Sequence, residues 1–146
     1  HLPSSVTRTA IIVADQQGDQ MVFTARCAMT EIITITVDSF DRSDLELAAK
    51  VEPLEQVIDG LIATTNARHI ERLKKGKCTV ELGMSLSDIT DTYERISDHC
   101  SNVAVCIVQG DDEEFEAHDY RKQQKADEEA WFAKKYEEFE AEYALP

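Results

Sequence analysis

The chain has 146 residues, of which 29 are acidic and 15 are basic, so its formal net charge is −14. A chain of this length suits one domain, because a fold of about 150 residues buries close to 70% of its unfolded surface. The negative charge argues against binding to nucleic acid or anionic lipid, whose phosphates would repel the protein. With only 5 Gly and 3 Pro, the composition favours long helices joined by few turns.

Residues 4–40 predict one long helix. The stretch EIITITV, residues 31–37, also fits a strand when taken alone, because β-branched residues are common in strands. Helical spacing of apolar residues runs through and around it, which decides for a helix. The apolar residues that define this spacing are Ala25, Met29, Ile32, Ile33, Val37 and Phe40.

A second helix is predicted after a break near residue 43. Ser43, with Glu46 three residues later, has the pattern of a capping box. Pro53 interrupts backbone hydrogen bonding, so a kink or a new helix start is expected near Glu52. Gly76 suits a left-handed cap at the far end. The packing seam of this helix takes steps of four and three at Leu47, Val51, Leu54, Ile58 and Leu61.

The third helix has the most regular pattern and ends at Gly110. Its seam alternates steps of four and three at Leu82, Leu86, Ile89, Tyr93, Ile96, Cys100, Val103 and Ile107. Near the C-terminus the same steps recur at Phe132, Tyr136, Phe139 and Tyr143. We therefore predict an all-α, antiparallel helical bundle. Residues 1–110 form three long helices, and residues 111–146 form an acidic linker and a C-terminal aromatic helix packed on the bundle.

Oxygen-bearing side chains recur at every fourth residue on the outer side of two predicted helices. Glu94, Asp98 and Asn102 lie off the seam of the third helix, and Glu55 and Asp59 flank the seam of the second. If both flanks face one groove, four carboxylates and an amide oxygen converge there. Such a set suits hard cations such as Mg, Ca or Mn. The alternative is a solvated acidic face, which is common on outer helical positions.

Catalytic motifs are not found in the sequence. No Glu-x-x-His pair occurs, and the di-iron carboxylate bundles require such pairs. There is no phosphate-binding glycine loop and no nucleophile beside an assigned base. The sequence predicts that the protein is not an enzyme.

Residues 51–108 resemble the PhoU family, most closely the PhoU-like C-terminal domain of bacterial sodium/phosphate cotransporter-related proteins. The family carries a Glu(or Asp)-x-x-x-Asp motif and a Glu-x-x-x-Asp-x-x-x-Asn motif. The matching residues here are Glu55 with Asp59, and Glu94, Asp98 and Asn102. The resemblance implies that these five residues hold a transition-metal ion or cluster, iron or zinc, on the surface of the bundle.

The resemblance also implies a role. The chain would be a metal-binding regulatory domain of a sodium-dependent phosphate transporter, acting in phosphate uptake or signalling. It would lie on the cytoplasmic side of the bacterial inner membrane, with the transmembrane part of the same polypeptide as its partner. Stand-alone members have two three-helix repeats where this chain has one, so a homodimer is left open. The alternative is a metal-free helical module for protein interaction or dimerisation.

Overall fold

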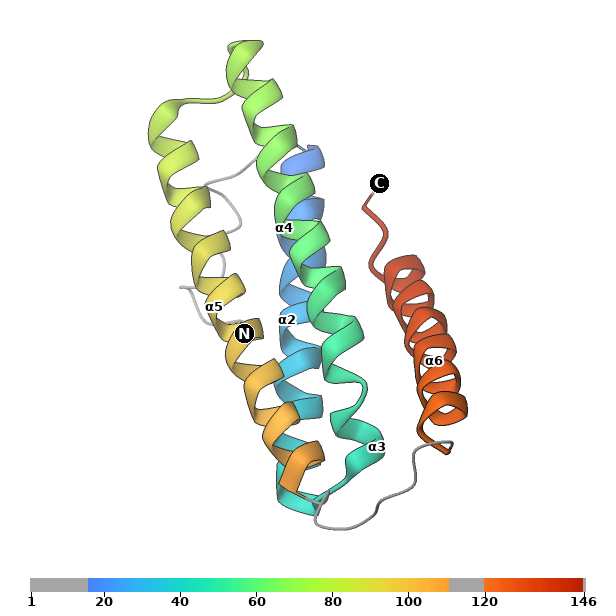
Figure 1. The fold of residues 1–146 in the computed structure, drawn as a ribbon. Coiled ribbons are helices and arrows are strands. Elements are labelled where there is room, and N and C mark those ends of the chain that lie inside the picture. The colour runs from blue at the N-terminus through green and yellow to red at the C-terminus, as the bar shows by residue number, and fades with distance from the viewer. Residues whose placement is uncertain (1–15, 111–119, 146) are drawn as a thin grey trace.

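Three long helices lie side by side and form the body of the protein (Figure 1). They are α2 (Gln16–Arg42), α4 (Val51–Lys74) and α5 (Val80–Gly110). A short helix, α3 (Leu45–Ala48), joins α2 to α4, and α6 (Tyr120–Glu142) follows α5. The structure is a computed structural model that describes residues 16–110 and 120–145, with side chains described for 24–109 and 127–145. This described part contains no strand, so the predicted all-α bundle is confirmed.

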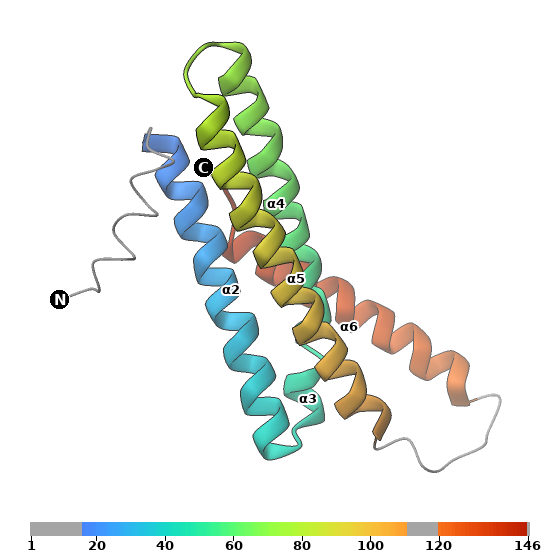
Figure 2. The same cartoon turned by 90° about the vertical axis from the view of Figure 1, so that its left-hand side faces the viewer.

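Helices α2 and α5 run downward and α4 runs upward in both views, so α4 is antiparallel to both of its neighbours (Figures 1 and 2). Each of the three long helices contacts the other two. The connection between α4 and α5 forms one end of the molecule and projects beyond the first turn of α2. Helix α6 packs on the outer side of α4 and crosses the bundle obliquely (Figure 2).

Helix α2 runs without interruption through the EIITITV stretch, as its flanking periodicity predicts. Threonine hydroxyls in and beside this stretch donate to backbone carbonyls in the preceding turn. Thr30 bonds to Arg26 at 2.9 Å and Thr36 bonds to Ile32 at 2.7 Å. These bonds satisfy the hydroxyl groups inside the helix, where they would otherwise compete for other partners. Residues 4–15 of the predicted helix lie outside the described residues, as does the acidic linker at 111–119.

The start of the second helical segment differs from the prediction. The N-cap is Asp44, whose carboxylate accepts a hydrogen bond from the Leu47 backbone N–H at 3.0 Å. Ser43 instead adopts a φ of 51°, which places it in the left-handed region just before the cap. The predicted capping box of Ser43 and Glu46 is therefore wrong. The chain uses the second of two adjacent capping residues, because the first makes the reversal between α2 and α3.

Pro53 and Gly76 mark the start and the end of α4, as the sequence predicts. Pro53 lies in the first turn of α4, where its missing N–H would have no helical partner in any case. At the other end Gly76 has a φ of 65°. The Lys77 N–H donates to the Arg72 carbonyl at 2.9 Å, and the Gly76 N–H donates to Leu73 at 3.0 Å. This pair of bonds is the Schellman motif, which closes the helix and starts the turn into α5.

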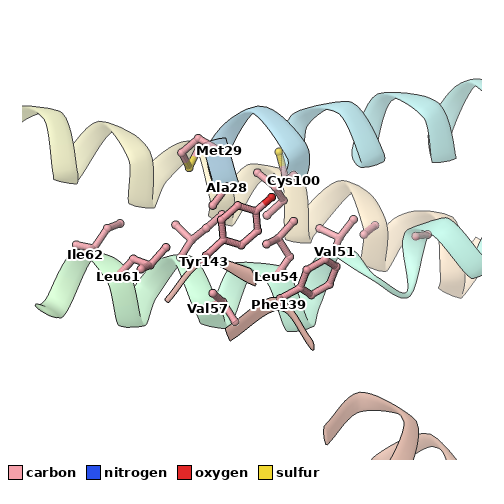
Figure 3. Close-up of a cluster of buried hydrophobic side chains, with 14 residues drawn as sticks. Ala28, Met29, Val51, Leu54, Val57, Leu61, Ile62, Cys100, Phe139 and Tyr143 are labelled. Atoms are coloured by element: carbon pink, nitrogen blue, oxygen red, sulfur yellow. The ribbon is translucent and has the colours of Figure 1, made fainter. Parts of the chain in front are cut away.

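The hydrophobic core is formed by the facing sides of the three long helices and by two aromatic residues, one near the end of α6 and one directly after it. Ile32, Leu54 and Ile58 are fully buried. Phe139 of α6, and Tyr143 directly after the helix, reach into the same cluster (Figure 3). The Tyr143 hydroxyl donates a hydrogen bond to the Glu31 carboxylate on α2. Helix α6 thus packs on the bundle, and the side chains of Phe139 and Tyr143 are buried.

Several residues that the apolar periodicity assigned to packing positions are exposed. Val37 is 52% exposed and Phe40 is 65% exposed, although both continue the apolar pattern of α2. Val103 on the seam of α5 is 38% exposed. These residues are apolar on sides of the helices where the described part of the chain places no further helix. Part of this surface is a groove of about 830 Å³ between the ends of α2 and α5, the α2–α5 groove. Its lining residues are Phe40, Ser43, Leu45, His99, Asn102, Val103, Cys106 and Ile107.

Candidate functional site

Two acidic helix faces meet along the contact between α4 and α5. On α4 the face consists of Glu52, Glu55 and Asp59, at spacings of three and four residues. On α5 it carries Glu94 and Asp98, four residues apart, followed by Ser101. Because the two helices are antiparallel, residues ascending α4 face residues descending α5. The antiparallel direction therefore pairs residues of the two faces in order: Glu52 with Ser101, Glu55 with Asp98, and Asp59 with Glu94.

One of these pairs forms a direct hydrogen bond. The Ser101 hydroxyl donates to the Glu52 carboxylate at 2.6 Å, so these two residues face each other across the two helices. The other two pairs interact through their charges. Asp98 acts on Glu55, and Glu94 is the strongest of the charges acting on Asp59. We call these six residues, Glu52, Glu55, Asp59, Glu94, Asp98 and Ser101, the acidic ladder.

The acidic ladder raises the pKa values of its own α4 carboxyls. Burial, followed by the charges of Asp59, Glu52 and Asp98, raises the pKa of Glu55 from 4.5 to about 7. Asp59 is exposed, but the neighbouring helix removes part of the hydration of its carboxylate, and this desolvation raises its pKa, followed by the charges of Glu94, Asp98 and Glu52. All charges that act on these two groups are negative. The negative charge on this surface is therefore left uncompensated, which is the electrostatic condition that favours a bound cation.

The structure gives the five predicted ligands two different surroundings. Glu55, Asp59, Glu94 and Asp98 belong to the acidic ladder. Asn102 is exposed and lines the α2–α5 groove. An increment of four residues advances about 40° beyond a full turn, so a column at this spacing drifts around the helix. Across two increments the drift carries Asn102 toward α2, while Ser101 faces α4.

Glu52 and Ser101 were missed by sequence reasoning. Glu52 precedes Glu55 by three residues and Asp59 by seven, so all three share one face of a helix. Ser101 likewise follows Asp98 by three residues and Glu94 by seven. A search at heptad spacing, in place of repeated steps of four, would have found both residues. They form a direct hydrogen bond between the two helices of the acidic ladder.

The chemistry of the acidic ladder fits a cation, but its side chains are not gathered around a point. Among the described residues, no three His, Cys, Asp or Glu side chains lie close enough together to hold one ion. The donors on the two helices are carboxylate and hydroxyl oxygens, which suit hard cations. Asp59, Glu94 and Asp98 are exposed. Exposed side chains change rotamer on a fast timescale, so these three carboxylates are not held in one position.

The structure also brings together a cysteine and a histidine that are nine residues apart. Cys78 Sγ lies 3.6 Å from Nδ1 of His69, and an Arg72 guanidinium nitrogen lies 3.4 Å from the same ring nitrogen. Burial and then the Arg72 charge lower the pKa of His69, so its imidazole is neutral at pH 7. The other ring nitrogen is buried against Gly83 on α5. This arrangement anchors the turn between α4 and α5.

These features define a class: an all-α helical bundle with an acidic, cation-compatible surface between two antiparallel helices. The sequence model of the PhoU domain matches residues 28–107, which covers more than half of the chain. The chain belongs to the PhoU domain family. PhoU domains are regulatory and not enzymatic, and they act in the regulation of phosphate transport. No curated protein and no solved structure matched the chain significantly. No helix within the described ranges is both long and apolar enough to cross a membrane.

Proposed function

We propose that the protein is a cation-binding regulatory domain of a sodium-dependent phosphate transporter. The transmembrane part of the same polypeptide would be its partner, on the cytoplasmic side of the bacterial inner membrane. Two lines of support carry the proposal. The PhoU family match supplies the link to phosphate transport. The acidic ladder, with a Glu55 pKa near 7 caused by burial and neighbouring carboxylates, supplies the link to a cation.

The proposal assigns the ion to Glu55, Asp59, Glu94 and Asp98, with Glu52 beside them. Asn102 enters the set if its side chain turns from the α2–α5 groove toward Asp98, one turn away on the same helix. When bound, the ion supplies positive charge that holds α4 and α5 together. Ligand type favours Mg, Ca or Mn, whereas resemblance to the family favours iron or zinc. Both expectations are open to the same measurement.

Elemental analysis of the chain, purified without chelator, tests the cation. We expect a stoichiometric metal in the unaltered chain and none in Asp98→Ala, because this substitution removes a carboxylate from the centre of the acidic ladder. Asp41→Ala is the matched control, since it removes an exposed aspartate of α2 that does not act on Glu55 or Asp59. If no variant holds metal after exposure to all five ions, the cation part of the proposal is wrong.

A metal-free interaction module is the second candidate function, and the α2–α5 groove favours it. Phe40 is 65% exposed beside a groove of about 830 Å³ whose lining residues carry no carboxylate, lysine or arginine. Exposed apolar surface of this kind marks interaction sites. If a second copy of the chain covers the groove, sedimentation will show a dimer that Phe40→Ser dissociates. Val80→Ser, an equally exposed apolar residue at the other end of the molecule, should leave the dimer intact.

A further inference from the structure

The turn between α4 and α5 differs in charge from the rest of the molecule. Residues 68–81 hold five of the 15 basic residues but only two of the 29 acidic ones. Lys74, Lys75 and Lys77 are all exposed there. The two acids are Glu71, which pairs with Lys74 at 2.9 Å, and Glu81 at the start of α5. The chain is strongly acidic as a whole, yet this end of it is basic.

Exposed aliphatic side chains accompany the lysines. Ile70 on α4 is 51% exposed, and Val80 and Met84 on α5 are each 67% exposed. Val80 and Met84 are four residues apart and so lie on one side of α5. The connection itself forms the extreme end of the bundle in both views (Figures 1 and 2). The tip is therefore convex, basic and apolar, and we call residues 68–84 the basic tip.

Along α4 and α5, the acidic residues outside the basic tip lie more than one screening length from its lysines, Lys74, Lys75 and Lys77. On α4 no acidic residue lies between Asp59 and Glu71, a rise of about 18 Å along the helix axis. On α5 the next acid after Glu81 is Asp88, about 10 Å further. The electrostatic screening length at physiological ionic strength is about 8 Å. A surface that touches the turn thus meets the positive charge of Lys74, Lys75 and Lys77.

We propose that the basic tip docks on the surface of an anionic lipid bilayer. The lysines would meet headgroup phosphates, and the exposed side chains of Ile70, Val80 and Met84 would enter the boundary between headgroups and acyl chains. A convex tip with aliphatic side chains at its edge suits a soft bilayer surface, which deforms around it, whereas a folded protein would need a concave pocket of matching shape. The Schellman turn at Gly76 holds the lysines in one place without a flexible loop. The inference does not depend on the cation proposed above.

Vesicle binding by the full chain tests this inference. The probes are vesicles of equal parts phosphatidylglycerol and phosphatidylcholine, compared with vesicles of phosphatidylcholine alone. We expect binding to the anionic vesicles only. The double variant Lys75→Ala/Lys77→Ala should weaken it about 25-fold, since each lysine near an anionic surface contributes about a fivefold increase in affinity. Met84→Ser should weaken binding at high salt, where the charge contribution is screened.

The double variant Lys134→Ala/Lys135→Ala is the control, because it makes the same change in total charge on α6. Equal losses in the two double variants would mean that only total charge matters and would overturn the basic tip. Absence of anionic-vesicle binding by the unaltered chain would also overturn it. Binding to polyglutamate but not to vesicles would identify an acidic protein as the partner instead. Circular dichroism of each variant excludes unfolding as the cause of a loss, and failure here leaves the metal analysis of Asp98→Ala unaffected.

Discussion

Glu55 links the acidic ladder to the stability of the protein through a proton. Its pKa in the folded state is about 7, against 4.5 for an unperturbed glutamate. Between these values the folded chain holds a proton that the unfolded chain has released. Stability contributed by this group is therefore present at low pH and is lost as the pH rises from about 4.5 to 7.

The prediction is that Glu55→Gln makes the protein less sensitive to pH in cation-free buffer. Solvent screens the partly exposed group, so we expect its contribution to change by about 1 kcal/mol over this window. Urea unfolding, followed by circular dichroism at several pH values, gives the free energy of unfolding of both proteins. Glu137→Gln on α6, which is exposed, should reproduce the unaltered pH dependence. Identical slopes for all three proteins would contradict the raised pKa.

Gly83 allows α5 to approach α4 closely. A Cβ atom at this position would lie 2.6 Å from Nε2 of His69, whose side chain is buried. We predict that Gly83→Ala lowers the free energy of unfolding by about 1–3 kcal/mol, the usual cost of overpacking. Gly60→Ala is a matched control, because nothing lies within 4 Å of a Cβ there and alanine is the better helix former. It should raise the free energy of unfolding by about 0.5–1 kcal/mol. If both variants are stabilised, the helices have moved apart at no cost.

Residue spacing predicted which acidic residues lie outside the core, but it predicted only some of the side chains that surround them. Off-seam positions for Asp59, Glu94 and Asp98 agree with their exposure in the structure. The register between α4 and α5 is not encoded within either helix, because it depends on side chains from both that meet only after folding. For that reason the hydrogen bond from Ser101 to Glu52 could not be read from the sequence. The drift of Asn102 around α5 is a geometric consequence that steps of four conceal.

At the scale of helices, the N-cap of α3 can be tested by substitution. The structure assigns the capping hydrogen bond to Asp44, whereas the sequence pattern favoured Ser43. We predict that Asp44→Ala lowers the free energy of unfolding by about 1 kcal/mol. Ser43→Ala should change it by less than about 0.5 kcal/mol, as is usual for an exposed residue without a special contact. Urea unfolding of the two variants measures the difference, and the reverse order would restore Ser43 as the cap.

Helix positions were predicted well because the apolar periodicity agrees with the residues that start and end helices. Gly76 and Pro53 mark boundaries by backbone geometry that no tertiary contact overrides. Periodicity fails in a different way at Phe40 and Val103. It identifies the side of a helix that is apolar, but it does not show whether another helix covers that side. Their exposure is therefore a finding about the arrangement of helices and not an error in assigning them.

The whole molecule is polarised along its long axis. The basic tip lies at one end, the α2–α5 groove lies toward the other, and the acidic ladder follows the side of the bundle between α4 and α5. Such a distribution cannot be seen in a net charge of −14. The sequence argument against anionic lipid used that total, whereas a screened interaction depends on charges within about one screening length. The fold creates the distinction by bringing residues 68–84 to a single end.

A cation bound to the acidic ladder should stabilise the whole bundle. An ion that binds only the folded state stabilises it by mass action, by about 2.7 kcal/mol at a concentration one hundred times its dissociation constant. It would also displace the proton from Glu55, so the pH dependence between about 4.5 and 7 should weaken as the ion saturates. Thermal unfolding of the chelator-treated chain, with and without added Mn or Zn, measures both effects. Asp98→Ala should show neither effect, and Asp41→Ala should show both. An equal rise in melting temperature for Asp98→Ala would place the ion away from the acidic ladder.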